Sequence, residues 1–151
     1  MDVMPSVLVL NGPNLNMLGV REPVIYGVET LGDIEQACSD RAHELGLQLE
    51  CRQSNHEGEM VTIIQDARAE HEGIVINAGA YAHTSVAIQD ALRLAELPVI
   101  EVHLSNVYQR ESFRHRSYIA AVADGLVCGL GAYGYLLALD AMAHLIEKDR
   151  D

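Results

Sequence analysis

Short apolar runs alternate along the chain with longer stretches that are typical of helices. Apolar runs of strand type are found at Ser6–Leu10, Ile74–Ile76 and Val99–His103. Leu47, Leu49 and Cys51 alternate with polar residues, which is the pattern of a half-buried strand. A fifth strand is expected within Ala121–Cys128.

Four helices are expected between and after these strands, at Thr30–Gly46, Glu57–His71, Thr84–Ala95 and Tyr133–Lys148. Thr30 is a typical N-cap residue with Asp33 three positions on, and Gly46 is a typical C-terminal stop. Gly73 is expected to end the second helix, and Pro98 marks the break before the fourth strand. These signals place a helix after nearly every strand.

Five strands that alternate with helices predict an α/β fold with a parallel sheet covered on both faces. A flavodoxin-like, doubly wound strand order is the leading expectation. Residues 1–151 are expected to form one domain, because a chain of 151 residues has the length of a typical single domain. Two segments exceed a simple connection, Asn11–Glu29 and Leu104–Ile119. Long loops in compact domains often carry function, so both are candidate site segments.

Small and polar residues follow every expected strand. The clusters are Asn11-Gly12-Pro13-Asn14, Gln53-Ser54-Asn55, Asn77-Ala78-Gly79, His103-Leu104-Ser105-Asn106 and Gly129-Leu130-Gly131. One such cluster would be ordinary turn chemistry. Five at the carboxyl edge of one parallel sheet, where open α/β sheets bind ligands, predict a polar pocket.

Glu101 and His103 stand two positions apart on the fourth strand, so their side chains share a face of the sheet. A carboxylate beside an imidazole orients the ring and helps it to hold its proton. This arrangement suits a general acid, although a structural histidine remains an equal alternative for the pair alone. Its place at the carboxyl end of a strand favours catalysis.

Arg21 and Tyr26 lie in the first long loop. A free tyrosine has a pKa of about 10, so a tyrosine base at neutral pH needs a stabilised phenolate. A nearby guanidinium favours the ionised form, and a partly desolvated site under a closing loop would strengthen that effect. Taken alone, an arginine and a tyrosine in a loop are more often surface residues.

Composition narrows the classes of partner. The net charge is −12, which argues against nucleic acid and means that an acidic substrate would need a local basic pocket. The N-terminus lacks a signal-peptide pattern, and no apolar run is long enough for a membrane span, so a cytoplasmic protein is expected.

Several other chemistries find no support. Gly129–Gly134 spells GxGxxG, but the chain ends before the strand and acidic residue that a dinucleotide site requires, so tight strand-to-helix packing is the favoured explanation. The histidines and the three cysteines lack metal-ligand spacing, and neither a metal nor a cofactor is expected. Lys148 is the only lysine, which leaves no pocket lysine for a Schiff base.

Five segments together resemble the type II dehydroquinases. They are NGPNLNMLGVREPVIYG (11–27), QSNHEGEM (53–60), NAGAYAHTSVAIQDAL (77–92), EVHLSNVYQRESFRHRSYI (101–119) and GLGAYGYLLAL (129–139). They follow in the order and spacing of that family and cover nearly the whole chain. Tyr108 and Gln109 depart from the His-Ala pair of many relatives, which leaves detail of that loop open.

The resemblance implies a flavodoxin-like fold, a homododecamer and the reversible dehydration of 3-dehydroquinate to 3-dehydroshikimate through an enolate. It implies that Tyr26 is the base, with Arg21 favouring its phenolate, and that His103 is the acid, with Glu101 as its partner. Asn14 would position a water at the enolate oxygen. The positions that match substrate-binding residues are Asn77, His83, Leu104, Ser105 and Arg114, and Asp90 matches a residue that reaches a neighbouring subunit's site.

Two other readings stay open at this point: a flavodoxin-like binding or signalling module, and an inactive relative kept for assembly. A receiver domain would need an acidic cluster after the first strand, and Asn11–Asn14 is not one. Flavin binding would favour aromatic stacking, and the chain has no Trp. The enzyme reading itself does not separate biosynthetic shikimate use from catabolic quinate use.

Overall fold

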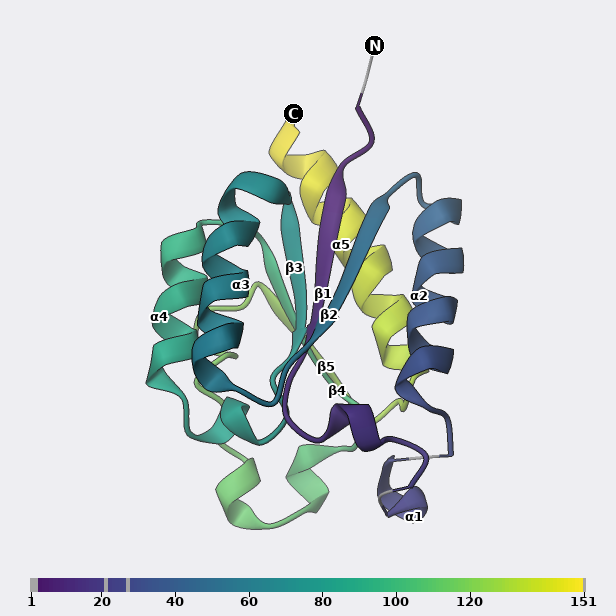
Figure 1. Cartoon of the computed structure of the whole chain (residues 1–151), viewed down its shortest axis with the longest axis vertical. Coiled ribbons are helices and arrows are strands. Elements are labelled where there is room, and N and C mark those ends of the chain that lie inside the picture. Colours follow the sequence, from purple (N-terminus) through teal and green to yellow (C-terminus); the bar gives the residue numbers. More distant parts are fainter. Residues whose placement is uncertain (1–2, 21, 27, 151) are drawn as a thin grey trace.

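The computed structural model describes residues 3–20, 22–26 and 28–150, with the backbone alone for Pro23 and Tyr26. Its centre is a five-stranded, all-parallel sheet in the order β2-β1-β3-β4-β5. The strands are β1 (Ser6–Asn11), β2 (Gln48–Gln53), β3 (Gly73–Asn77), β4 (Val99–His103) and β5 (Gly125–Cys128). The expected flavodoxin-like α/β fold is therefore confirmed, including the strand order (Figure 1).

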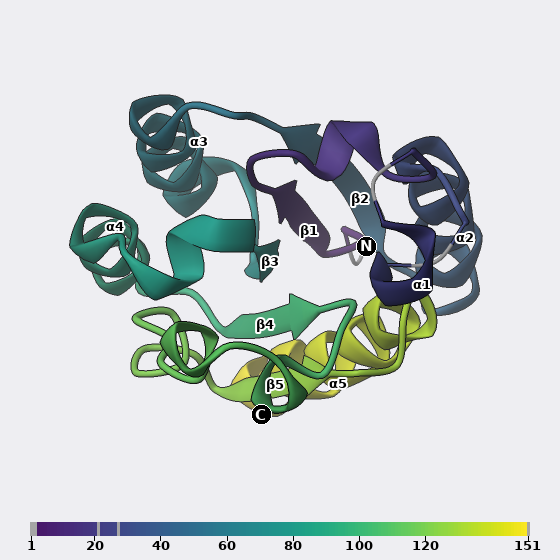
Figure 2. The same ribbon diagram turned by 90° about the horizontal axis from the view of Figure 1, so that it is seen from below.

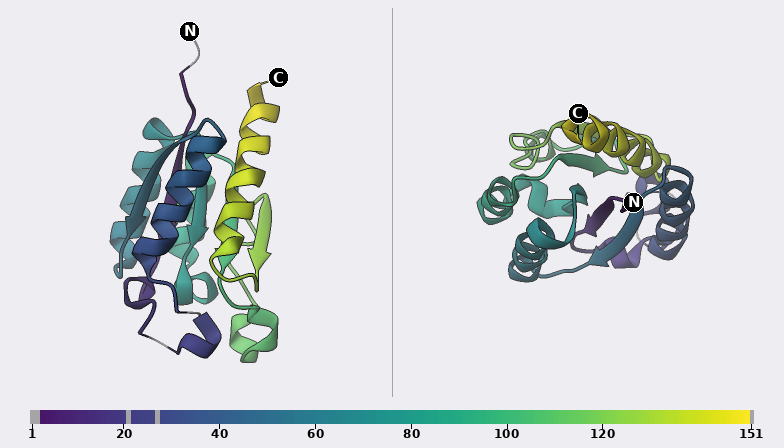
Figure 3. Two further views of the ribbon diagram at one scale, coloured as in Figure 1. Left: turned by 90° about the vertical axis from the view of Figure 1, so that its right-hand side faces the viewer. Right: turned by 90° about the horizontal axis from the view of Figure 1, so that it is seen from above.

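Two pairs of helices cover the two faces of the sheet. The helices α2 (Leu31–Glu44) and α5 (Tyr133–Arg150) share one face, and α3 (Glu57–Glu70) and α4 (Val86–Ala95) share the other, as Figures 1 and 3 show. Successive side chains of β1 point to opposite faces of the sheet, so this strand contributes to the hydrophobic core on each face. Val7 and Val9 belong to the cluster under α2 and α5, whereas Leu8 and Leu10 belong to the cluster under α3 and α4. A strand buried on both faces needs the continuous apolar run that the sequence contains.

Short elements occupy the two long loops. The helix α1 (Pro23–Tyr26) lies in the first loop after a 3₁₀ turn at Leu15–Met17. The second long loop contains 3₁₀ turns at Val107–Gln109 and Ser112–Arg114, and another follows β3 at Gly79–His83. Viewed along the sheet from below, these elements gather around the carboxyl ends of β1, β3 and β4 (Figure 2).

Most predicted boundaries agree with the structure. Thr30 caps α2 in a reciprocal capping box with Asp33, and Gly46 follows the helix with φ of +71°. Gly73 does not end a helix, because α3 ends at Glu70 and Gly73 begins β3. A Cβ there would lie 2.3 Å from Met142 Sδ, so this glycine lets α5 approach the sheet.

One predicted helix is shorter than expected, and the fifth strand lies in the second half of its expected range. The helix predicted from Thr84 begins at Val86, because Ser85 is the N-cap and its hydroxyl accepts the backbone N–H of Ile88. Residues 121–124 lie outside β5 in a turn. Asp124 closes that turn: its carboxylate accepts the N–H of Val99 at 2.9 Å, and its own N–H reaches the Val99 carbonyl.

The glycines of the GxGxxG segment allow a left-handed backbone and close packing, as expected. Gly129 has φ of +87°, and a Cβ there would lie 3.0 Å from Asn106 Cβ. A Cβ on Gly134 would lie 3.3 Å from Val127 Cγ1, so this glycine lets α5 start close to the sheet. In the described residues, no helix combines the length and the apolar character that crossing a bilayer requires.

Candidate active site

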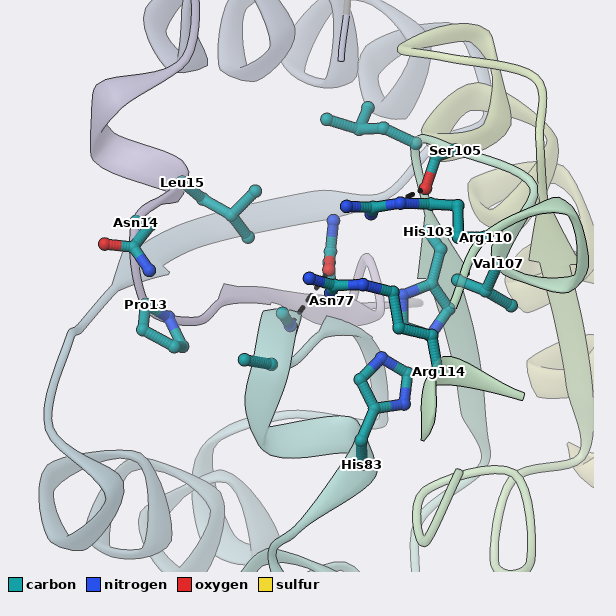
Figure 4. Close-up of a pocket in the computed structure, with 13 residues that line it drawn as sticks. Pro13, Asn14, Leu15, Asn77, His83, His103, Ser105, Val107, Arg110 and Arg114 are labelled. Carbon is teal, nitrogen blue, oxygen red and sulfur yellow. Dashed lines mark hydrogen bonds between the residues drawn. The ribbon is translucent and has the colours of Figure 1, made fainter. Parts of the chain in front are cut away.

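A cavity of about 70 Å³ opens at the carboxyl ends of the strands (Figure 4). Its walls come from the segments that follow β1, β3 and β4. The lining residues with polar side chains are Asn14, Asn77, His83, His103, Ser105, Arg110 and Arg114. Three of the five predicted polar clusters thus contribute to its wall.

The other two clusters act beside the cavity. The cluster after β2 supports the loop after β1: Gln53 Nε2 donates to the Gly12 carbonyl at 3.1 Å, and the Asn14 N–H donates to Asn55 Oδ1 at 3.0 Å. The cluster after β5 supplies Gly129 and Gly131 to a neighbouring cavity of about 530 Å³. Because two predicted clusters do not line the smaller cavity, the expectation that all five form one pocket is too broad.

Asn14 adopts the left-handed conformation, with φ of 70°. Asparagine tolerates this region better than most residues, so the sequence allows a sharp turn directly after β1. The turn packs tightly against the loop after β3. Gly12 donates its N–H to the Asn77 carbonyl at 2.8 Å, and a Cβ on Gly12 would lie 2.4 Å from the Ala78 carbonyl oxygen. The two loops therefore hold each other in place at the rim of the cavity.

Asn77 is 3% exposed, and its amide orientation is determined by two bonds. Its Oδ1 accepts the N–H of Gly79 at 3.1 Å, and its Nδ2 donates to the Tyr135 hydroxyl at 3.0 Å. Tyr135 in turn donates to Asn11 Oδ1 at 2.5 Å, and burial raises the pKa of its phenol. An amide nitrogen has two hydrogens, so a fixed Asn77 can still offer one donor to a ligand.

The predicted acid pair forms on β4. His103 Nε2 lies 2.5 Å from Glu101 Oε2, and Glu101 is fully buried while His103 is 6% exposed. Ser117 also donates its hydroxyl to the same carboxylate oxygen at 2.7 Å. With Nε2 engaged, Nδ1 is the ring nitrogen of His103 that remains for a ligand, which is the geometry of a proton donor facing a cavity.

His83 stacks against His103, with ring centroids 6.0 Å apart and planes inclined by 15°. Its Nδ1 lies 2.8 Å from the Arg116 carbonyl oxygen and so donates to it. Burial, with smaller contributions from the charges of His103 and Arg114, lowers the pKa of His83. A neutral ring whose Nδ1 carries the hydrogen presents Nε2 as a hydrogen-bond acceptor.

Two guanidinium groups give the cavity a basic wall in an acidic chain. Arg110 Nη1 donates to the Ser105 hydroxyl at 3.3 Å, and Arg114 Nε donates to Glu111 Oε2 at 2.8 Å. Both arginines line the cavity in Figure 4. This is the local basic environment that an acidic substrate requires.

Sequence reasoning identified Arg114 but missed Arg110, Ser117 and Tyr135. Arg110 could have been found, because it lies four residues before Arg114 in a loop already marked as functional. Ser117 and Tyr135 act through other side chains, and no local pattern reveals such contacts. Leu104, 5% exposed, and Ser105 line the cavity as expected.

Arg21 and the side chain of Tyr26 lie outside the described residues. The backbone of α1 comes close to the site, because its Val24 and Ile25 line the neighbouring cavity. Asp90 is exposed on α4 and does not line the cavity within one chain.

One group in the described part of the chain has metal-ligand types close together, with ligand atoms of Glu50, Glu70 and His71 within 4.8 Å of one another. None of these three residues lines the cavity. His71 is already held by Ser6 and Glu50 through its two ring nitrogens. The candidate active site itself is built from amide, imidazole, hydroxyl and guanidinium groups, with the Glu101 carboxylate behind His103, and these groups suit acid–base chemistry.

Comparisons with known proteins agree on one family. The family described as "Dehydroquinase class II" matches residues 5–143. A protein of Pseudomonas putida named 3-dehydroquinate dehydratase 2 is 60% identical over 144 residues, which span 95% of this chain and 97% of that protein. A 3-dehydroquinate dehydratase of Brucella canis is 56% identical over 146 residues, 97% of this chain and 93% of that protein.

Solved structures extend the likeness to the fold. The type II dehydroquinase of Propionibacterium acnes matches with a TM-score of 0.90 at 44% identity, over 95% of this chain and 99% of that one. A 3-dehydroquinate dehydratase-like protein of Bifidobacterium longum matches with a TM-score of 0.72 at 35% identity, again over 95% and 99% of the two chains.

Proposed function

The chain belongs to the class II dehydroquinase family, and we propose that it is a hydro-lyase that converts 3-dehydroquinate reversibly into 3-dehydroshikimate and water. The observation that carries the proposal is the buried Glu101–His103 pair at the wall of a cavity that also holds Arg110 and Arg114. The pair supplies a proton donor, and the arginines supply charge for an anionic substrate.

The proposed reaction removes a proton and a hydroxyl group from neighbouring carbons. Tyr26, as a phenolate favoured by Arg21, takes the C2 proton, and the electron pair of that bond forms an enolate. The C1–O bond then breaks as His103 gives its proton to the departing hydroxyl, which leaves as water. The enolate electrons form the new carbon–carbon double bond, so atoms and charge balance.

The remaining cavity residues bind and orient the substrate in this proposal. Ser105 and the backbone of Leu104 hold the substrate carboxylate. Asn77, His83 and Arg114 bind its other polar groups, and Asn14 positions a water at the enolate oxygen. The polar atoms of Asn77 and His83 are fixed by internal bonds, which supports their use as oriented partners. The mechanism requires no metal or cofactor.

The same proposal includes assembly and location. From the resemblance to the type II dehydroquinases we propose a homododecamer in the cytoplasm, in which Asp90 reaches a neighbouring subunit's site. Support comes from α4, where the apolar side chains of Val86 and Leu94 are 51% and 63% exposed on the helix that carries Asp90. Light scattering should give a particle of twelve chain masses, and a monomer would contradict this part.

A direct assay tests the function. The purified protein, with a chelator present, should convert 3-dehydroquinate to a conjugated enone that absorbs in the ultraviolet. Tyr26→Phe should abolish turnover while the fold is retained. Tyr133→Phe is the matched control, because Tyr133 is 61% exposed at the start of α5 and should leave turnover unchanged. A folded, inactive wild-type protein would refute the proposal.

The pathway is a separate question. Biosynthetic use in the shikimate pathway is our proposal, and catabolic use of quinate remains the alternative with the same chemistry. Deletion of the gene should make the cell require aromatic amino acids in the biosynthetic case. Loss of growth on quinate alone would favour the catabolic case.

A further inference from the structure

Glu101 has an unusual environment for a carboxylate. It is fully buried, and only one of its oxygens is hydrogen-bonded. Oε2 receives both His103 Nε2 and the Ser117 hydroxyl, whereas Oε1 has no partner within the described part of the chain. A buried charge is costly unless hydrogen bonds compensate for lost water. The two partners at Oε2 therefore supply all the hydrogen bonds that hold this buried carboxylate within the described part of the chain.

The Ser117 hydroxyl has its single hydrogen directed by the backbone. Its oxygen accepts the N–H of Ile119 at 3.1 Å and the N–H of Ala120 at 3.0 Å. A serine hydroxyl has two acceptor sites and one hydrogen. With both acceptor sites engaged, the hydrogen points to Glu101 Oε2, 2.7 Å away. Ser117 is thus an oriented donor that serves only the carboxylate.

We infer that Ser117 is a positioning residue of the dehydration: its hydroxyl fixes the Glu101 carboxylate, and Glu101 in turn fixes the His103 ring as the acid at the cavity wall. The inference rests on the proposed function. Without the Ser117 hydroxyl, the buried carboxylate loses one of its two donors and no longer holds the imidazole in one orientation. A poorly oriented imidazole is a poorer proton donor to the departing hydroxyl, so the loss falls on the chemical step.

The other groups that face His103 do not provide this effect. His83 stacks on the ring from the turn after β3, and Arg110 and Arg114 approach from the loop after β4. A guanidinium offers only donors, so neither arginine can accept a hydrogen from the ring. Glu101 is therefore the acceptor that orients His103, and Ser117 is the hydroxyl that orients Glu101.

The test compares Ser117→Ala, Glu101→Gln and the double variant by kcat and KM for 3-dehydroquinate. Ser117→Ala should lower kcat by about 10- to 100-fold, the range for a hydrogen bond to a charged group, with KM changed by less than about threefold. Ser117→Thr retains a hydroxyl and should restore most of the activity.

The double variant separates positioning from mere structure. If Ser117 acts through Glu101, adding Ser117→Ala to Glu101→Gln should cost little more than Glu101→Gln alone. Multiplicative losses, or a Ser117→Ala kcat equal to that of wild type, would overturn the inference. Ser85→Ala is the matched control, because its buried hydroxyl accepts the backbone N–H of Ile88: it should lower stability without lowering kcat. These outcomes require an active wild type, so an inactive wild type would refute the proposed function instead.

Discussion

Asn77 and Tyr135 are joined by a buried hydrogen bond of 3.0 Å, although 58 positions separate them in the sequence. The bond connects the end of β3 to the first turn of α5. Tyr135 passes the connection on to Asn11 at the end of β1, so one phenol ties together the two strands that carry the centre of the site. A helix on one face of the sheet thereby determines the orientation of an amide that lines the cavity.

Tyr135→Phe should show how much this bond contributes. The change removes only the hydroxyl but leaves Asn77 Nδ2 and Asn11 Oδ1 without their partner in a buried place. We expect the free energy of unfolding to fall by about 1–3 kcal/mol. Denaturant unfolding measures the loss, with the exposed Tyr133→Phe as control. Unchanged stability would show that the phenol hydroxyl contributes nothing net.

The fold was predictable because its signals are local. Apolar runs, the Thr30 capping box and the Gly46 stop each depend on residues close in sequence. The parallel sheet then follows from alternation of strands and helices. Each error has a local cause: α4 begins at Val86, after the Ser85 N-cap, rather than at Thr84, and Gly73 allows close packing against Met142 rather than ending a helix.

The parts of the site that follow from local sequence were predictable: the polar clusters after β1, β3 and β4, and the acid pair on β4. Glu101 and His103 share a face because they are two positions apart on β4, and the structure confirms their contact. Ser117 and Tyr135 reach the site from other elements, so their roles depend on tertiary contacts that no sequence pattern contains. The predicted roles of the site residues remain predictions until they are tested by substitution.

Gly12→Ala should strongly disturb the rim of the cavity. A Cβ at this position would lie 2.4 Å from the Ala78 carbonyl oxygen, and backbone on both sides leaves no flexible group to move. We expect a loss of about 1–3 kcal/mol in unfolding free energy, as for overpacked interiors. Gly58→Ala is the matched control: it is exposed in α3 with nothing within 4 Å of the added carbon. That control should gain about 0.5–1 kcal/mol from helix propensity, and equal effects at both sites would contradict the steric argument.

His103→Ala should separate the two proton transfers of the proposed reaction. Without the acid, turnover should fall by about 10²–10⁴-fold. The base and the enolate site remain, so the variant should still exchange the C2 hydrogen of 3-dehydroquinate for deuterium in heavy water. Tyr26→Phe should lose both the exchange and the turnover. Proton NMR of the substrate measures the exchange, and its absence in His103→Ala would argue against a separately formed enolate.

His83 should make the stability of the protein depend on pH in a defined window. Its pKa is lowered below the ordinary 6.5, chiefly by burial, while its bond to the Arg116 carbonyl opposes the shift. The unfolded chain therefore binds more protons than the folded one as pH falls through about 6.5, so stability falls with acidification there. Carboxyl groups such as Asp33 and Glu111 have lowered pKa values and change the stability only at more acidic pH.

Urea unfolding of wild type and His83→Gln between about pH 7.5 and 5.5, at one protein concentration, measures this effect. The free energy of unfolding should decline less steeply with falling pH in the variant. Parallel curves for the two proteins would contradict this prediction, because they would show that burial does not disfavour the charged form of His83.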